Sequence, residues 1–314
     1  MIKSTFRFPV QLVSGFSGSQ FATFTPVDIN RVMQWRRPLV AVIVATMICF
    51  SADYVVAEEP ASQPVNILLI TGGCCHDYVF QTKAMQLAFK DLGVAANWTV
   101  VNEGGTGTKA KISFYNNPEW AAGFDVVIHN ECFAGTKDAE YIRKITSAHK
   151  AGVNAVVIHC AMHTYRKADV DDWREFLGVT SRHHEHQSEY PITVTDKEHP
   201  AMAGFPQPYR SAKDELYVVE KTWPNTKVLA KSTSEKNGKS YPVIWTNAYG
   251  KARVFGTTFG HSNETFQDPT FLKLVVQGTV WAARGDGSDL ADKDSADGEA
   301  AESKEGEAAP VTAG

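Results

Sequence analysis

The feature that most constrains the fold is an apolar segment that ends abruptly in reactive side chains. Residues 155–158 are apolar without polar alternation, which is typical of a parallel strand covered by helices on both faces. Ligands of an open α/β sheet bind at the carboxyl ends of its strands. Here that end carries His159, Cys160 and His163.

Two earlier segments have the same design. The segment 65–70, which is apolar except for Asn66, leads into Thr-Gly-Gly-Cys-Cys and then His76 and Asp77. The segment 125–128, which is apolar after Asp125, leads into a His-Asn-Glu-Cys run that includes Asn130. Because the carboxyl ends of parallel strands lie at one edge of a sheet, the three segments predict one shared site.

Strands and helices alternate over short loops in the first half of the domain, which predicts a doubly wound parallel sheet. The expected strands cover residues 65–70, 97–101, 125–129 and 155–158, and the expected helices start after Asp77, at residue 136 and at residue 169. Short strands separated by turn residues follow, over 190–195, 215–219, 228–231, 242–245 and 252–258. We therefore expect an α/β fold with a mainly parallel sheet, antiparallel additions in the C-terminal half, and a last helix from Asp268-Pro269.

The N-terminal residues predict an export signal over residues 1–57. Three arginines precede the apolar residues 39–50, and the small residues before Ala57 suit a signal peptidase. Translation from Met33 would give an ordinary signal, so residues 1–32 are expected not to be translated. A membrane anchor is the alternative, but the apolar run is short for a span. We expect a periplasmic or secreted protein with no stable membrane span after cleavage.

Composition defines the rest of the domain organisation. The ordered domain is expected over 65–284, because residues 285–314 are acidic, rich in Gly, Ala and Ser, and too poor in apolar residues to fold. A net charge of −4 gives no basic footprint, so we expect no nucleic-acid partner.

Four cysteines remain after the predicted cleavage, and all follow or end predicted strands: Cys74, Cys75, Cys132 and Cys160. An oxidising compartment would let them form a disulfide near the site. They could equally be small buried hydrophobic residues. The sequence leaves both alternatives open.

Histidines concentrate at the same strand ends and in a His-His-Glu-His run over 183–186. Alternation along an extended segment predicts that His184 and His186 point to the same side. A cluster of His159, His186 and His261, with His76 and Glu215 near by, would suit a divalent transition metal. The alternative for each histidine is a structural hydrogen bond or a place in solvent.

The turn after residue 158 is where α/β enzymes expose a nucleophile, and Cys160 is a candidate. Its flanks lack the Gly-x-Cys-x-Gly pattern that permits so tight a turn. His159 occupies the more natural position, which favours acid–base work or metal ligation there.

At these residues the sequence resembles the trehalose-utilisation (ThuA-like) family, whose fold is similar to class I glutamine amidotransferases. The resemblance runs from about Val65 to Ala283. Its motifs are Ile70-Thr71-Gly72-Gly73 with His76-Asp77, Val157 to Ala161, His186 before Tyr190, His199-Pro200 with Gly204, Asp214 to Tyr217, and Gly256 to His261 with Asp268-Pro269 and Trp281-Ala282-Ala283. It implies a flavodoxin-like sheet with His159 in place of the amidotransferase cysteine, which disfavours glutaminase activity. It also implies a role in catabolism of trehalose-like disaccharides or keto-sugars.

Together these observations predict an exported protein that acts on a small carbohydrate. The expected catalytic residues are His159, His186, His261, Asp77 and Glu215. The expected substrate-binding residues are His76, His163, Asn130 and Tyr217, with Tyr217 able to stack on a sugar ring. Two alternatives remain open: a non-catalytic sugar-binding module, and a metal-dependent hydrolase in which His159, His186 and His261 hold the metal.

Overall fold

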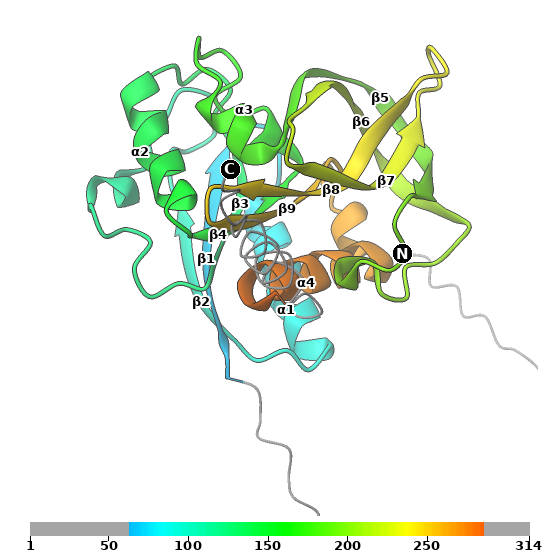
Figure 1. Ribbon diagram of the computed structural model, residues 1–314, viewed down its shortest axis with the longest axis horizontal. Helices are drawn as coiled ribbons and strands as arrows, with labels where there is room; N and C mark the ends of the chain where they lie inside the picture. Colours follow the sequence, from blue (N-terminus) through cyan, green and yellow to red (C-terminus); the bar gives the residue numbers. More distant parts are fainter. Residues whose placement is uncertain (1–62, 286–314) are drawn as a thin grey trace, which may run out of the picture. The chain divides into compact units, whose positions relative to one another are not determined.

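The computed structural model describes residues 63–285 (Figure 1). The predicted export signal and nearly all of the predicted acidic tail lie outside these residues and stay predictions. The strands are β1 (Val65–Gly73), β2 (Ala96–Asn102), β3 (Val126–Cys132), β4 (Asn154–Ile158), β5 (Val179–Val194), β6 (Tyr209–Thr222), β7 (Thr226–Thr233), β8 (Ser240–Tyr249) and β9 (Ala252–Thr257). The α-helices are α1 (Tyr78–Asp91), α2 (Ala139–Lys150), α3 (Asp172–Leu177) and α4 (Pro269–Arg284).

All these strands join one sheet in the order β2-β1-β3-β4-β9-β8-β7-β5-β6. The pairs from β2 to β9 are parallel, and those from β9 onward are antiparallel. The predicted flavodoxin-like α/β fold is confirmed. One detail was wrong: β9, expected as an antiparallel addition, pairs parallel to β4 and extends the parallel half by one strand.

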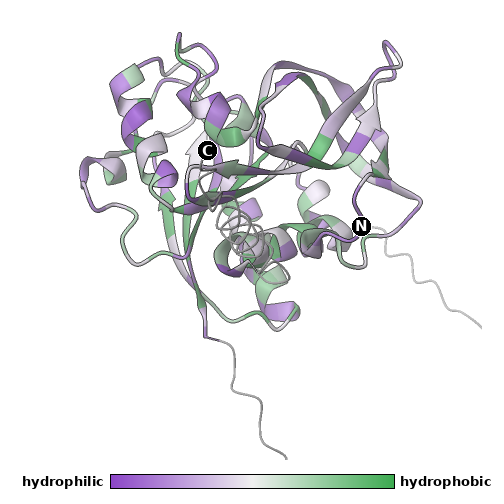
Figure 2. Ribbon diagram, in the orientation of Figure 1, coloured by the Kyte–Doolittle hydropathy of each residue, from purple (hydrophilic) through white to green (hydrophobic). Residues whose placement is uncertain are grey.

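Two cores cover the faces of the parallel strands. Alternate residues of β1 point to opposite sides: Ile67 and Leu69 pack with α1 and α4, and Leu68 and Ile70 pack with α2 and α3. Figure 2 shows hydrophobic residues along the strands between the helices and hydrophilic residues on the outer surface of α2. Burial on both faces explains why these strands lack polar alternation.

Side-chain caps set where the helices begin. Asp77 accepts a hydrogen bond from the Phe80 amide at the start of α1, and Asp268 accepts one from Thr270 at the start of α4. The start of α2 was predicted two residues too early, because the cap is Asp138. None of the helices within residues 63–285 is long and apolar enough to cross a membrane.

The antiparallel half bends back over the ends of the parallel strands. Strand β6 is the last in the sheet order, yet the Tyr217 hydroxyl lies 3.3 Å from Nε2 of His159, directly after β4. Figure 1 shows β5, β6 and β7 as a curved extension beside the parallel strands. This curvature brings side chains of β5 and β6 to the strand ends that carry the histidines.

Candidate functional site: a histidine cluster at the strand ends

Three histidines from distant parts of the chain lie against one another. His76 follows β1, His159 follows β4 and His261 follows β9. Their ring centroids are 5.0 Å apart for His76 and His159, 5.1 Å for His76 and His261, and 5.4 Å for His159 and His261. One nitrogen from each ring lies within 4.8 Å of the other two. We call these three residues the histidine cluster.

His159 forms the floor of the cluster. It takes the sharp turn after β4 with a left-handed φ of 45°, as expected for the residue at this turn. Its Nδ1 donates to the Thr258 carbonyl at 2.7 Å, so Nε2 is left to accept from the Tyr217 hydroxyl. Burial lowers the pKa of His159 well below its usual value, so the ring is neutral at neutral pH.

His76 is also held in one tautomer. Its Nδ1 donates to the His261 carbonyl at 2.8 Å, and its Nε2 lies 3.0 Å from Sγ of Cys160. Burial is the main cause that lowers the pKa of His76 to about 4. Two neutral imidazoles with unprotonated Nε2 atoms therefore face the cluster.

His261 differs because a carboxylate stands beside it. Its Nδ1 lies 3.4 Å from Oε1 of Glu215, an ion-pair distance without hydrogen-bond alignment. Glu215 raises the pKa of His261. Protonated His261 therefore stabilises the folded state. This stabilisation is complete at pH values below the pKa of the histidine in the unfolded chain, and it is lost as the pH rises through the higher pKa of the folded state.

Glu215 is shared by three histidines. Besides His261 it approaches Nδ1 of His184 at 3.4 Å and Nε2 of His159 at 3.7 Å, both through Oε2. Gln187 closes the other side of His261, with its Nε2 at 2.7 Å from the imidazole Nε2. His184 and Gln187 are exposed, so the cluster opens to solvent on the β5 side.

Asp214 holds the turn that carries His261. Its buried carboxylate accepts from the amides of Gly260 at 2.9 Å and His261 at 3.2 Å, and from the Thr265 hydroxyl at 2.7 Å. Burial raises the pKa of Asp214 to about 6 despite these donors. The carboxylate is a positioning group beneath the cluster.

Gly260 is required by the same turn. Its φ is 134°, and a Cβ there would lie 2.8 Å from Cγ2 of Ile158 and 3.0 Å from Cβ of His159. We expect Gly260→Ala to lower the free energy of unfolding by about 1–3 kcal/mol, the usual cost of such a conformation. Urea denaturation measures this. Gly107→Ala, where a Cβ would meet nothing within 4 Å and φ is ordinary, is the matched control. Equal losses in both variants would contradict the argument.

His186 is not part of the cluster, so the expectation that it joins His159 and His261 as a catalytic residue or metal ligand is wrong. Its Nε2 lies 2.9 Å from Glu235 on the exposed side of β5. The reason is a bulge: His184 is opposite Tyr217 and Gln187 is opposite Glu215, so β5 has one residue more than β6. Gln187 therefore takes the place that simple alternation gave to His186.

Asp77 also lies outside the cluster. It is exposed, and its carboxylate caps α1. Asp77 was expected to be the carboxylate partner of a histidine, but Glu215 is that partner. Asp214 supports the turn that carries His261.

Three residues expected to bind substrate are buried instead. Asn130 donates to Gln81 at 2.9 Å. His163 lies 3.2 Å from the Ser181 hydroxyl, and burial lowers its pKa to about 2. Tyr217 is fully buried, and the His163 ring stacks on it at 4.0 Å. The expectation that Tyr217 stacks on a sugar ring is wrong, because that face is covered by protein.

Two of the site residues that the pattern missed had partial signals in the sequence. Asp214 is adjacent to Glu215, so two neighbouring carboxylates in a strand marked the place. His184 was recognised in the histidine run, but it was predicted to point to the same side as His186, which lies outside the site. Gln187 had no signal, since only the bulge brings it to His261.

Both fates considered for the cysteines occur. Cys74 and Cys75 form a disulfide, and Cys132 and Cys160 are free and buried. The sulfurs of Cys74, Cys75 and Cys132 are close enough to share a metal ion. Because thiolates are the metal ligands, the disulfide removes two of the three.

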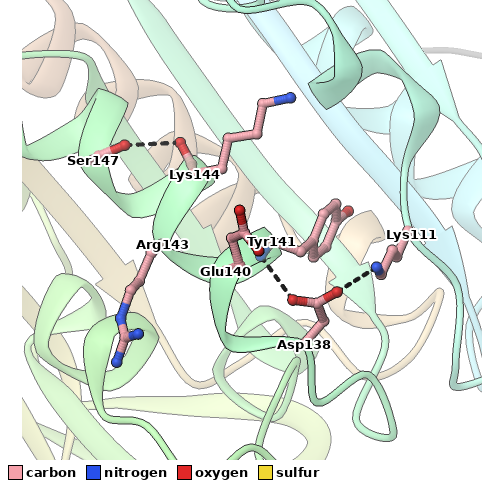
Figure 3. A pocket seen from close by; sticks show the side chains of 7 residues that line it. All are labelled: Lys111, Asp138, Glu140, Tyr141, Arg143, Lys144 and Ser147. Carbon is pink, nitrogen blue, oxygen red and sulfur yellow. Dashed lines mark hydrogen bonds and ion pairs between the residues drawn. The ribbon is translucent and has the colours of Figure 1, made fainter.

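A hollow on the surface of α2 lies apart from this chemistry. Figure 3 shows its lining: Lys111, Asp138, Glu140, Tyr141, Arg143, Lys144 and Ser147. Lys111 pairs with Asp138, whose other oxygen caps the helix at Tyr141. No histidine or cysteine lines this hollow, so we place the site at the histidines.

Comparison with known proteins points to a single family. The sequence profile of the ThuA family, described as trehalose utilisation, matches residues 66–282. The crystal structure of a ThuA-like protein from Parabacteroides merdae is 23% identical, with a TM-score of 0.57 over 71% of this chain and 91% of that one. A ThuA-like protein from Bacteroides uniformis is 18% identical, with a TM-score of 0.55 over 72% and 94%. No protein with a curated description matches the sequence. At these identities the solved structures support the fold alone.

Proposed function

This chain belongs to the ThuA family of trehalose utilisation, and on that premise we propose that its histidine cluster carries out proton-transfer chemistry on a carbohydrate. One observation carries the proposal: His76, His159, His261 and Glu215, from four separate segments, converge where the strands end. Converging titratable groups with opposite pKa shifts are typical of acid–base sites.

The groups divide into two roles. His261 is the most basic of the three because of Glu215, and it is partly exposed, so it is the proton donor. His76 and His159 are neutral, and their Nε2 atoms accept hydrogen bonds. A sugar presents hydroxyl donors to such acceptors, and the carbonyl of a keto-sugar would take the proton held by His261. Because the family is one of trehalose utilisation, the substrate class that we propose is a trehalose-like disaccharide or its keto derivative.

The test is a panel of disaccharides and their 3-keto derivatives offered to the purified protein. We expect at least one to raise the melting temperature and to be converted, with the product followed by mass spectrometry. Binding without conversion would favour a non-catalytic sugar-binding module. No effect from any sugar would overturn the proposal.

A metal-dependent hydrolase is the second candidate, and the tautomers favour it. A histidine that ligates a metal usually donates its other ring N–H to a carbonyl or carboxylate. His76 donates Nδ1–H to the His261 carbonyl and His159 donates Nδ1–H to the Thr258 carbonyl, which leaves both Nε2 atoms unprotonated. These two residues and His261 would hold the ion. A bound divalent cation supplies a Lewis acid and a water of lowered pKa.

Metal analysis separates the two candidates. If the cluster binds metal, protein purified without chelator will hold about one zinc, iron, nickel or copper ion per chain, as expected for one site. The ion will be lost in His76→Ala and kept in His183→Ala, since His183 lies on the exposed side of β5 beside Glu220. Activity that survives removal of all metal would instead support acid–base chemistry by the histidines alone.

A further inference from the structure

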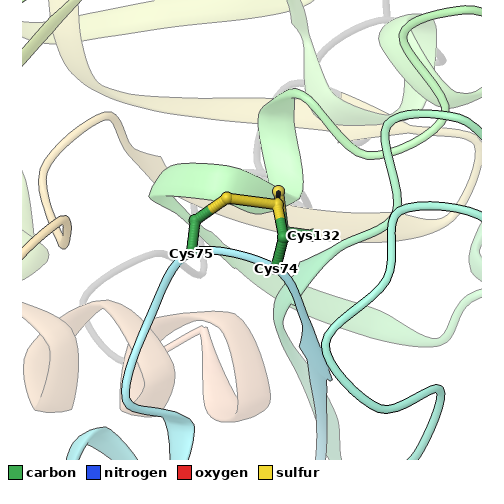
Figure 4. A group of neighbouring side chains, drawn as sticks. All are labelled: Cys74, Cys75 and Cys132. Carbon is green, nitrogen blue, oxygen red and sulfur yellow. Dashed lines mark hydrogen bonds between the residues drawn. A yellow bond between two sulfur atoms is a disulfide. The ribbon is translucent and has the colours of Figure 1, made fainter.

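Four cysteine sulfurs form a row from the protein surface to the histidine cluster. Cys75 is exposed and is joined to Cys74 by a disulfide between neighbouring residues. Sγ of the buried, free Cys132 lies 3.5 Å from Sγ of Cys74 (Figure 4). Cys160 packs against Cys132, and its Sγ lies 3.0 Å from Nε2 of His76.

We propose that Cys74, Cys75 and Cys132 form a thiol–disulfide exchange site, in which the bond moves from Cys74–Cys75 to Cys74–Cys132 and uncovers Cys75 as a reactive thiol. The Cys132 thiolate attacks Sγ of Cys74, and a new sulfur–sulfur bond forms there. The bond to Cys75 breaks, and its electron pair leaves on Sγ of Cys75, which takes up a proton from solvent in place of the one lost by Cys132. One disulfide and one thiol are present before and after, so the step needs no oxidant or reductant.

The backbone brings the new pair within bonding range. Gly73 is the register partner of Cys132 on the adjacent parallel strands β1 and β3, and Cys74 is the next residue. Cys74 therefore lies beside Cys132 at the end of the two strands, and the two Sγ atoms are 3.5 Å apart. The attacking and attacked sulfurs are therefore already neighbours.

The attacking sulfur is activated by its surroundings. The neighbouring Cys160 side chain is the main cause that lowers the pKa of Cys132, which favours the thiolate. The thiolate is the form that attacks a disulfide.

The position of Cys75 favours the departure of its sulfur from the disulfide. Cys75 has a φ of 86°, a conformation that costs a non-glycine residue energy, and opening the ring with Cys74 frees it to relax. Exposure of Cys75 lets water solvate the departing thiolate. His76 is the next residue, so the bond that moves constrains the loop that holds one member of the histidine cluster.

Alkylation distinguishes the two forms, because only Cys75 is exposed while Cys132 is buried. The purified full chain, without reductant, is incubated with N-ethylmaleimide, quenched with acid, digested at low pH and mapped by mass spectrometry. We expect time-dependent label on Cys75 together with a Cys74–Cys132 linked peptide. In Cys132→Ser we expect label on Cys75 to fall by at least about tenfold, because the intramolecular nucleophile is gone.

A second variant keeps the test decisive if Cys132→Ser does not fold. In Cys75→Ser treated with oxidised glutathione, Cys74 and Cys132 should form a disulfide directly. Failure to form this bond in the folded variant would overturn the proposal. Three results with the wild type would also overturn it. The first is labelling of Cys75 equal to that in folded Cys132→Ser. The others are recovery of the Cys74–Cys75 disulfide alone, and label on Cys74 and Cys75 with no linked peptide.

Discussion

Replacing His261 by alanine is expected to lower turnover of the accepted sugar by about 10²- to 10⁴-fold, the usual range for loss of a general acid or base. The reason is that His261 is partly exposed and is the member of the cluster whose pKa Glu215 raises. The measurement is kcat with the sugar identified in the panel, with binding followed separately by the shift in melting temperature.

Two controls make this result specific. His183→Ala and His186→Ala should keep full turnover, because these side chains pair with Glu220 and Glu235 on the exposed side of β5. Glu215→Gln should retain part of the turnover but move its decline to lower pH, since the pKa of His261 falls when the carboxylate is lost. Full activity in His261→Ala, or an unchanged pH profile in Glu215→Gln, would contradict the assigned roles.

A second large effect is expected outside the cluster, at a buried chain of three polar residues. His149 donates Nδ1–H to the Val153 carbonyl at 2.7 Å, and burial lowers its pKa well below the usual value. Its Nε2 therefore accepts a hydrogen bond from Nε2–H of His129 at 3.0 Å. The other nitrogen of His129, Nδ1, lies 3.0 Å from Oε1 of Glu131.

Breaking this chain leaves buried groups without partners. We expect His129→Leu to lower the free energy of unfolding by about 3–5 kcal/mol, the usual loss when one partner of a buried pair is removed. Glu131 would then keep no partner for its side chain, since its second oxygen already has none. Urea denaturation gives the value.

The double variant His129→Leu/Glu131→Leu should recover much of that stability, because apolar residues of similar volume often replace a buried pair without loss. The exposed His186→Leu should change stability by no more than about 0.5 kcal/mol. If His129→Leu lost no more than His186→Leu, the buried chain would not be coupled to folding.

The parallel half of the fold could be predicted because its signals are local. Continuous apolar runs mark strands buried on both faces, and Asp77 and Asp268 mark helix starts within a few residues. The convergence of His76 and His159 was predictable for the same reason, since the ends of parallel strands share one edge of a sheet.

The position of β9 and the bulge in β5 were not predictable in this way. A short apolar strand has the same pattern whether its neighbour runs parallel or antiparallel, so nothing within residues 252–257 assigned β9 to β4. A bulge leaves no mark in the alternation of a polar histidine run, yet it moved His186 out of the site and Gln187 into it.

By itself, therefore, the sequence determined the parallel α/β framework and the histidines at its strand ends, because those features depend on neighbours along the chain. Only the tertiary structure decided which carboxylate meets them. Glu215 and Asp214 come from the last strand of the sheet, and they reach His159 and His261 because the antiparallel half bends back over the parallel strands. That contact spans about 50 residues and depends on sheet curvature, which no local pattern encodes.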